Sequence, residues 1–231
     1  MPNDAVLRLE GASVVFDGFK ALDIDRFEVC EHEMRVVIGP NGAGKTTLCD
    51  VISGKTRLNT GRVFLAGEDV SELRDVEIAR RGVGRKFQTP SLFGSLTTWE
   101  NLDLASRVTH ERMGAVAKLM GLGSLVDVEA QYLSHGQRQA LELGMLVVAD
   151  ARLMLLDEPA AGLSDEETAA MAALLKQLAG ERTLIVIEHD MDFVRELDAP
   201  VTVLNEGRVL AEGPMQVIQS DPRVVEAYLG R

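Results

Sequence analysis

Aliphatic runs and amphipathic stretches alternate along the chain, and they predict a mixed α/β protein. Residues 6–9 and 13–16 are β-rich runs, and the following Asp17 and Gly18 are typical of a turn, so we expect antiparallel strands at the start. Continuous aliphatic runs of strand length come later, which is the pattern of parallel strands covered on both faces. These runs are residues 35–38, 153–156 and 184–187.

Helical periodicity dominates the stretch between residues 88 and 149, in which no convincing strand occurs. The clearest helical stretches are residues 99–102, 113–120 and 138–149. The chain is therefore expected to interrupt its α/β part with a helical insertion.

Two further local signals mark a helix start and a hairpin. Ser164 and Glu167 form a capping box, apolar residues follow at helical spacing, and Gly180 is a plausible C-cap. Residues 201–204 and 208–211 flank a short segment that contains Gly207, which predicts a β-hairpin.

Composition narrows the class of protein. The chain has 231 residues, 46% hydrophobic and 26% charged, which is ordinary for a globular protein. Its net charge of −12 argues against broad nucleic-acid binding. Cys30 and Cys49 give no disulfide framework, so we expect a reducing compartment. Residues 1–4 do not begin a signal peptide, and the apolar runs are shorter than the roughly 20 residues that a membrane helix needs.

The first chemical motif follows the strand at residues 35–38 and matches the G-x-x-x-x-G-K-[ST] phosphate-binding loop, or P-loop. Its glycines let successive backbone N–H groups face an anion, and the next helix adds a favourable partial charge. Lys45 can then reach the β- and γ-phosphates of ATP, and the Thr46 hydroxyl can bind Mg²⁺. A glycine turn that binds nothing is the competing interpretation. The predicted ATP-binding residues here are Gly39, Pro40, Asn41, Gly42, Ala43, Gly44, Lys45, Thr46 and Thr47.

A second candidate site lies where a buried strand ends in two adjacent carboxylates. Asp157 is suited to hold Mg²⁺ through its water shell, and Glu158 to orient or deprotonate the attacking water. A solvated acid pair with no chemical role is the alternative. The P-loop upstream argues against that alternative.

A third motif, Leu-Ser-His-Gly-Gln at residues 133–137, precedes a helix. Ser134 offers a hydroxyl and Gly136 a bare N–H at the helix N-terminus, which makes a second anion site, although an ordinary Ser-capped helix is the alternative. The motif resembles the LSGGQ signature of ATP-binding cassette (ABC) ATPases. In that family the signature binds ATP held by a partner's P-loop, so the resemblance implies a head-to-tail dimer. The implied contacts to the partner's ATP are Ser134, His135, Gly136 and Gln137.

The resemblance extends over nearly the whole chain and assigns further roles. Gln88 resembles the Q-loop glutamine, and His189 resembles the switch histidine that bonds the γ-phosphate. Phe16 lies where the family places an aromatic ring against adenine, with simple core packing as the alternative. The implied catalytic residues are Glu158, His189 and Gln88, and the implied Mg²⁺ ligands are Thr46, Gln88 and Asp157.

The chain departs from the family pattern at two positions. His135 stands where the commonest signature has a second glycine, and a histidine tolerates positive φ less freely than glycine does. Ser164 stands where many members carry an aspartate in the D-loop, the stretch after the acid pair. Both departures fall in the machinery that, by the resemblance, links the two protomers and their ATP sites.

The implied fold class is α/β: a P-loop NTPase (RecA-like) core with an antiparallel β subdomain and an inserted helical subdomain, as in ABC ATPases. We expect a single ABC ATPase domain over residues 1–231. Residues 1–87 and 150–231 would form the nucleotide-binding α/β core, and residues 88–149 the helical signature subdomain.

Finer resemblance points to the ATPase subunits of branched-chain amino acid and urea importers. Residues 78–88, 160–163 and 228–231 carry it, and residues 133–137, 165–167 and 188–194 favour the urea branch. This implies an ATPase that energises urea import, with branched-chain amino acids or another small polar solute as alternatives. A further alternative is a non-transport ABC ATPase acting on nucleic acid or the ribosome, against which the compact acidic chain argues.

The resemblance also implies partners and a location. The partners are a second ABC ATPase subunit (the same or a sister chain), transmembrane permease subunits and, indirectly, a solute-binding protein, with no nucleic acid. The expected location is the cytoplasmic face of the cell membrane, as a peripheral subunit. Residues 90–99 are the candidate docking surface, in which Leu92, Phe93 and Leu96 fit either a partner's groove or a small core.

Overall fold

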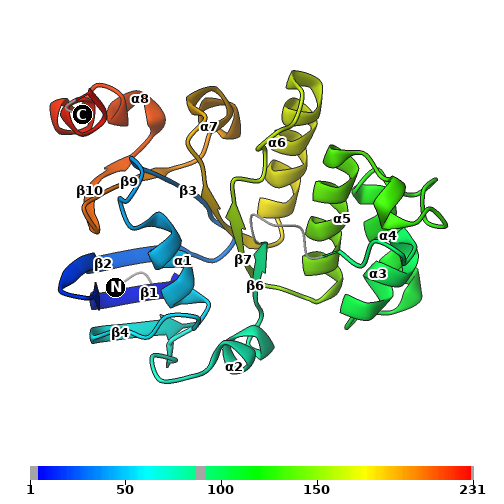
Figure 1. The fold of residues 1–231 in the computed structure, drawn as a ribbon, viewed down its shortest axis with the longest axis horizontal. Helices are drawn as coiled ribbons and strands as arrows, with labels where there is room; N and C mark the ends of the chain where they lie inside the picture. The colour runs from blue at the N-terminus through cyan, green and yellow to red at the C-terminus, as the bar shows by residue number, and fades with distance from the viewer. Residues whose placement is uncertain (1–4, 87–91, 230–231) are drawn as a thin grey trace.

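The computed structural model describes residues 5–86 and 92–229, whose strands form a four-stranded and a six-stranded sheet (Figure 1). The four-stranded sheet is antiparallel with the order β2-β1-β4-β5, and comprises β1 (Ala5–Phe16), β2 (Phe19–Cys30), β4 (Thr60–Leu65) and β5 (Glu68–Asp69). The six-stranded sheet has the order β10-β9-β3-β8-β7-β6, and comprises β3 (Met34–Ile38), β6 (Val83–Lys86), β7 (Leu153–Asp157), β8 (Thr183–Ile187), β9 (Val201–Asn205) and β10 (Arg208–Gly213).

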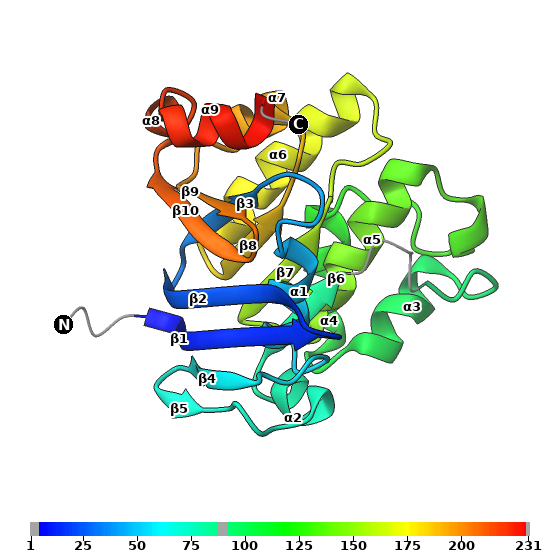
Figure 2. The ribbon, with the colours of Figure 1, turned by 60° about the vertical axis from the view of Figure 1, so that its left-hand side comes forward.

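Helices connect the strands of the six-stranded sheet (Figure 2). The first part of the chain contributes α1 (Lys45–Ile52) after β3 and α2 (Asp75–Arg80) before β6. Between β6 and β7 lie α3 (Thr98–Ala105), α4 (His110–Leu119), a 3₁₀ turn (Ala130–Tyr132) and α5 (His135–Val148). The rest are α6 (Asp165–Ala179), α7 (Met191–Leu197), α8 (Met215–Ile218) and α9 (Pro222–Leu229).

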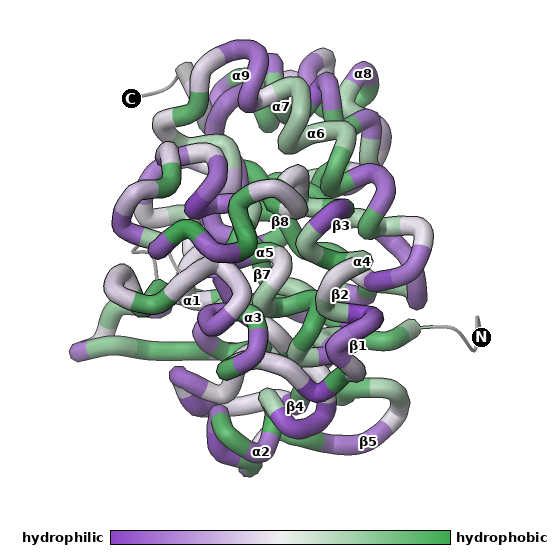
Figure 3. Tube along the Cα trace, turned by 90° about the vertical axis from the view of Figure 1, so that its right-hand side faces the viewer, coloured by the Kyte–Doolittle hydropathy of each residue, from purple (hydrophilic) through white to green (hydrophobic). Residues whose placement is uncertain are grey.

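The parallel strands are buried on both faces, as their continuous aliphatic runs predict. Within β3, Val36 and Ile38 join one apolar cluster, while Val37 joins the other. Successive side chains of a strand point to opposite faces, so one run of aliphatic residues supplies both clusters. Figure 3 shows the result, with hydrophobic strands such as β7 and β8 inside and hydrophilic segments gathered toward the outside.

The start of the chain differs from the prediction. Residues 6–9 and 13–16 belong to one long strand, β1, rather than to two short ones. Gly11 has a φ of 56°, and the pairing of β1 with β4 shifts between Glu10 and Ser13. This irregularity interrupts the alternation of the sequence without ending the strand. The predicted turn at Asp17 and Gly18 is confirmed, and it joins β1 to β2.

Two other local predictions are confirmed. Ser164 caps α6 through its side chain and forms a capping box with Glu167, and Gly180 is the C-cap. The hairpin β9–β10 turns at Glu206 and Gly207, whose φ angles of 49° and 77° suit a type I′ turn.

The helices between β6 and β7 share a core with the parallel sheet. Leu102 from α3 and Met113 from α4 lie in the same apolar cluster as Val36 from β3. The second cluster joins the antiparallel sheet to α1 and the other face of the parallel sheet.

Candidate functional site

The P-loop closes tightly between β3 and α1, and its glycines are required for that closure. A Cβ on Gly39 would lie 2.2 Å from the carbonyl oxygen of Leu204, and one on Gly44 would lie 2.7 Å from that of Ala21. Gly44 also has a φ of 100°, which side chains rarely tolerate. No side chain caps the start of α1 at Gly44. The N-terminus of this helix is therefore open to an anion.

Lys45 is held against the loop that precedes it. Its Nζ donates to the carbonyl oxygens of Gly39 at 2.6 Å and Pro40 at 3.0 Å. Burial lowers the pKa of Lys45, while the charges of Glu158 and Asp157 oppose that effect. Phosphate oxygens at the loop would offer this ammonium better acceptors than the two neutral carbonyls do.

Asp157 and Glu158 lie at the end of β7, beside the P-loop lysine. Asp157 is 5% exposed, and burial, followed by the charge of Glu158, raises its pKa. Glu158 adopts a φ of 48°, and its N–H donates to the carbonyl of Ile187 at 3.0 Å. The positive φ turns the chain away from the strand, so that adjacent carboxylates have different surroundings.

The donors near Asp157 suit Mg²⁺ bound together with a nucleotide. No group of three or more His, Cys, Asp or Glu side chains in the described part of the chain could hold a metal. Of the predicted Mg²⁺ ligands, only Thr46 and Asp157 lie within the described residues. Mg²⁺ is usually bound by one or two protein oxygens with water and substrate phosphates completing its shell. The predicted residues fit such an ion.

The structure brings His189 to Glu158. The His189 Nδ1 lies 3.2 Å from the Glu158 Oε1, and the histidine side chain is 65% exposed. A histidine beside the proposed general base can contact both that base and a phosphate in the same space.

Phe16 lies outside the core. It is 49% exposed at the end of β1, and its pairing partner Phe19 is 64% exposed. The geometry contradicts the core-packing alternative, and stacking on adenine stays a prediction.

The signature residues begin α5, apart from the P-loop: α5 and α1 are separated in both Figure 1 and Figure 2. Ser134 is the N-cap, and its Oγ accepts the N–H of Gln137 at 3.2 Å. The Gln137 side chain in turn accepts the Ser134 N–H at 2.9 Å. The hydroxyl proton of Ser134 remains available to a phosphate. Gln88 and Pro90 lie outside the described residues.

Sequence reasoning missed several buried charges around the site. Glu188 is 2% exposed, and burial raises its pKa although it accepts the N–H groups of Ala160 and His189. Lys86 lies 3.8 Å from Glu142, and both are buried. The only available signal for Glu188 was an acid directly after an aliphatic strand, the same signal that marks Asp157.

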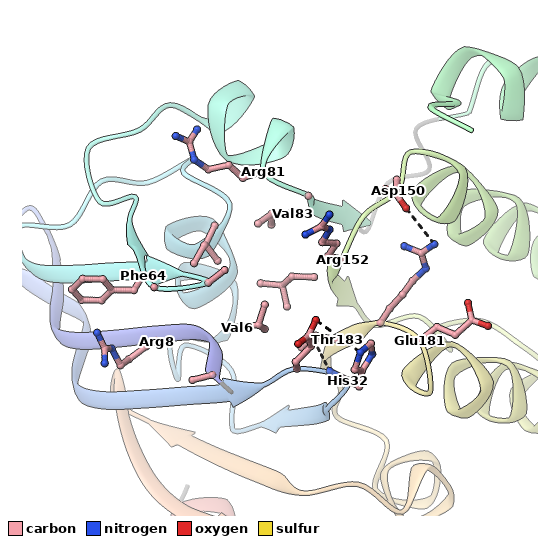
Figure 4. A pocket seen from close by; sticks show the side chains of 18 of the residues that line it. Val6, Arg8, His32, Phe64, Arg81, Val83, Asp150, Arg152, Glu181 and Thr183 are labelled. Atoms are coloured by element: carbon pink, nitrogen blue, oxygen red, sulfur yellow. Dashed lines mark hydrogen bonds and ion pairs between the residues drawn. The ribbon is translucent and has the colours of Figure 1, made fainter. Parts of the chain in front are cut away.

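A cavity of about 650 Å³ is lined by none of the predicted site residues that the structure describes (Figure 4). It is lined by the first residues of three parallel strands, Val83, Leu153 and Thr183, whereas the P-loop and the acid pair follow strand ends. Its arginines are largely engaged: Arg81 contacts Glu68 at 2.7 Å, for example. Ligands of parallel sheets bind beyond the carboxyl ends of the strands, so this cavity is not the nucleotide site.

Comparisons with known proteins agree with this geometry. A family model described as "ABC transporter" matches residues 22–161, and one described as "Branched-chain amino acid ATP-binding cassette transporter" matches residues 208–231. A crystal structure of a nucleotide-free ATP-binding cassette from an ABC transporter is similar, with a TM-score of 0.88, 29% identity, and coverage of 98% of this chain and 100% of that one. An ADP conformation of such a cassette has a TM-score of 0.89 at 29% identity, covering 98% and 99%.

The chain therefore belongs to the ABC transporter family, as an ATP-binding cassette with ATPase activity coupled to transport. The predicted fold class is confirmed. A probable branched-chain amino acid transport ATP-binding protein LivG of Archaeoglobus fulgidus is 34% identical over 97% of this chain and 95% of its own. A high-affinity branched-chain amino acid transport ATP-binding protein BraF of Pseudomonas aeruginosa is 34% identical over 97% and 98%. None of the helices in the described ranges has the length and apolar composition that a bilayer-spanning segment needs.

Proposed function

We propose that this chain is the ATP-hydrolysing subunit of an importer for branched-chain amino acids. The names of the similar LivG and BraF proteins and the family match at residues 208–231 support this cargo over urea. These comparisons give no support to the urea interpretation, which rested on short segments such as residues 133–137. No residue of the cassette specifies the cargo by its own chemistry.

The observation that carries the ATPase mechanism is the convergence of Lys45, the acid pair and His189 at one edge of the sheet. On nucleotide binding, the Lys45 ammonium would exchange the Gly39 and Pro40 carbonyls for β- and γ-phosphate oxygens. The Thr46 hydroxyl and Asp157 would hold Mg²⁺, which would supply charge neutralisation at the phosphates.

Glu158 orients or deprotonates the attacking water, and His189, 3.2 Å away, bonds the γ-phosphate. Gln88 is proposed to contact Mg²⁺ or this water. The adenine would stack on Phe16, while the remaining P-loop groups cradle the phosphates. The remaining P-loop groups are the backbone N–H groups and side chains of Asn41, Gly42, Ala43 and Thr47.

The second half of each site would come from another cassette, either a copy of this chain or a sister subunit. The signature lies apart from the P-loop of its own chain, so its Ser134 hydroxyl and Gly136 N–H are proposed for the γ-phosphate on the partner. We propose that residues 88–149 act as the helical signature subdomain. The pair would dock on permease subunits at the cytoplasmic face of the membrane, with a solute-binding protein delivering the cargo.

A substitution at Glu158 tests the catalytic assignment. Glu158→Gln is expected to lower ATP hydrolysis by at least about 10²-fold, the usual contribution of a general base. ATP affinity should be kept, because Lys45 and the P-loop are unchanged. The exposed Glu196→Gln is the matched control and should hydrolyse ATP at the wild-type rate. Hydrolysis that survives in Glu158→Gln would contradict the assigned role.

Uptake assays test the cargo. Cells that lack this chain would be complemented with wild-type protein or Glu158→Gln and given labelled leucine or labelled urea. We expect the wild-type chain to restore leucine uptake and the variant not to restore it. Restoration of urea uptake alone would support the alternative cargo.

A further inference from the structure

The side chain of His135 bridges the start of α5 and the loop between β7 and α6. Its Nε2 lies 3.0 Å from the carbonyl oxygen of Ala161. A carbonyl oxygen only accepts hydrogen bonds, so this nitrogen carries the proton and donates it. Ala161 is three residues beyond Glu158 on the loop that follows the acid pair. The imidazole therefore joins the signature to the loop that carries the proposed general base.

The surroundings of the ring fix its place. Gly162 has a φ of 74°, and a Cβ at this position would crowd the His135 Nε2 at 3.3 Å. On the other side, the buried Gln139 amide lies 3.4 Å from the same nitrogen. The tight approach and the positive φ both favour a glycine at position 162.

A second contact joins the same two helix starts. The Gly136 N–H lies close enough to the Glu167 carboxylate to help lower the pKa of Glu167, and a Cβ on Gly136 would lie 2.6 Å from the Glu167 Oε1. Glu167 also accepts the N–H of Ser164 at 3.0 Å and its hydroxyl at 3.1 Å. Both departures from the family pattern, His135 and Ser164, thus lie at one junction.

A bound nucleotide would affect the His135–Ala161 and Gly136–Glu167 contacts differently. A γ-phosphate from the partner's site would compete with Glu167 for the Gly136 N–H, since both are anions at one helix N-terminus. The His135 contact uses the imidazole and the Ala161 carbonyl, and it does not involve the Gly136 N–H for which the phosphate would compete. It would persist when the phosphate binds.

We propose that His135 is a positioning residue that couples the two ATP sites of a cassette pair. The proposal rests on the function proposed above, in which the signature reads the partner's ATP and Glu158 acts on the chain's own ATP. Through His135 and Ala161, closure of the signature on one nucleotide sets the position of the loop that follows Glu158 at the other. Two sites coupled through a shared element bind cooperatively.

The test compares His135→Gly, His135→Ala and His135→Gln in the transporter complex purified through a tag on this chain. The Hill coefficient of ATP hydrolysis should fall from a value between 1 and about 2, the number of sites, to about 1 in the Gly and Ala variants. We expect the apparent affinity of the complex for ATP to drop roughly fivefold or more, a typical loss of coupling. Binding of a fluorescent ATP analogue to a single chain should not change, because the P-loop is untouched.

Controls separate coupling from a general loss of structure. His135→Gln keeps an N–H donor within reach of Ala161 and should retain most of the cooperativity. His110→Ala removes an exposed histidine of α4 and should behave as wild type. Wild-type cooperativity in His135→Gly would overturn the proposal, and so would a wild-type Hill coefficient of about 1. In either case, ATP hydrolysis by the wild-type complex would leave the proposed function standing.

Discussion

The carboxylate of Asp157 belongs to the candidate site, and its burial in the ionised form destabilises the fold. The side chain is buried, and burial and the neighbouring Glu158 raise its pKa above 3.8, so folding favours the protonated form. At neutral pH the ionised group therefore lowers the free energy of unfolding. A cation at the site would stabilise the ionised carboxylate and reverse this effect. Such destabilisation in the absence of the cation is expected of a magnesium ligand.

Asp157→Asn should therefore stabilise the nucleotide-free protein at neutral pH, by about 1.4 kcal/mol for a pKa difference of one between folded and unfolded chains. The gain is complete above the folded pKa, shrinks as the pH falls through it, and vanishes below the unfolded value of 3.8. Urea unfolding at a series of pH values measures this. The same variant should lose most of the added stability that Mg²⁺ and ATP give the wild type.

Asp50→Asn is a useful comparison for that experiment. Asp50 is a second acid near the P-loop, but it contacts Arg85 through an ion pair. Its neutralisation takes one ion pair away from a cation whose side chain is only 6% exposed, so it should destabilise the protein. Equal effects of the two substitutions would contradict the assignment of Asp157 as a site carboxylate whose burial outweighs the attraction of the nearby cations.

At the scale of single residues, the sequence predicted those site residues that local patterns along the chain can mark. Asp157 ends β7 and His189 follows β8, whereas Lys45 begins α1 as part of a motif with fixed spacing, so local patterns are sufficient to place them. The contacts of Lys86 with Glu142 and of His135 with Ala161 join distant segments, and no local pattern reports such pairs. Glu188 could be recognised as a buried charge at the site only from the structure.

At the scale of elements, α9 ties the C-terminal segment to the P-loop. The Gly39 N–H lies close enough to the Tyr228 hydroxyl to oppose the effect of burial, which raises the pKa of Tyr228 to about 12. Val224 of the same helix is buried in the larger apolar cluster. Gly39 thus has the Tyr228 hydroxyl near its N–H, while its carbonyl accepts from Lys45.

Tyr228→Phe is expected to lower the free energy of unfolding by about 1 kcal/mol, since it leaves the Gly39 N–H without this acceptor. It should also raise the KM for ATP, because the P-loop loses part of its support. Denaturation and steady-state hydrolysis measure the two effects. Tyr132→Phe, at a 74% exposed position, is the matched control. A KM that rises equally in both variants would argue against a specific contact.

Element prediction failed where a backbone irregularity overrode the pattern. The sequence of β1 reads as two runs because Gly11 breaks the alternation, yet its neighbours β2 and β4 pair on both sides of the break. Pairing with other strands continues the strand where local propensity would end it. The capped helix α6 was predicted correctly because its start signal is local.

At the scale of the whole molecule, the helices between β6 and β7 carry the candidate docking surface. Asn101, fully buried, accepts the Phe93 N–H at 2.9 Å and donates to the carbonyls of Phe93 and Leu96 at 3.1 and 3.2 Å. This bonding fixes the loop, with Phe93 56% exposed and Leu92 packed on the core. Leu92 therefore fits the small-core interpretation, while the exposed Phe93 is available to a partner and its docking stays a prediction.

Phe93→Asp should abolish most uptake in the transporter while sparing ATP binding, because a charge in a desolvated protein contact costs several kcal/mol and the P-loop is remote in sequence and fold. Val76→Asp is the control: Val76 is 54% exposed on α2, which Figure 1 places away from α3 and α4. Labelled-leucine uptake, ATP binding and co-purification of the permease would be measured for both. Loss of co-purification in Phe93→Asp alone identifies docking as the step affected. Normal uptake in Phe93→Asp, or equal losses in both variants, would place the permease on another surface.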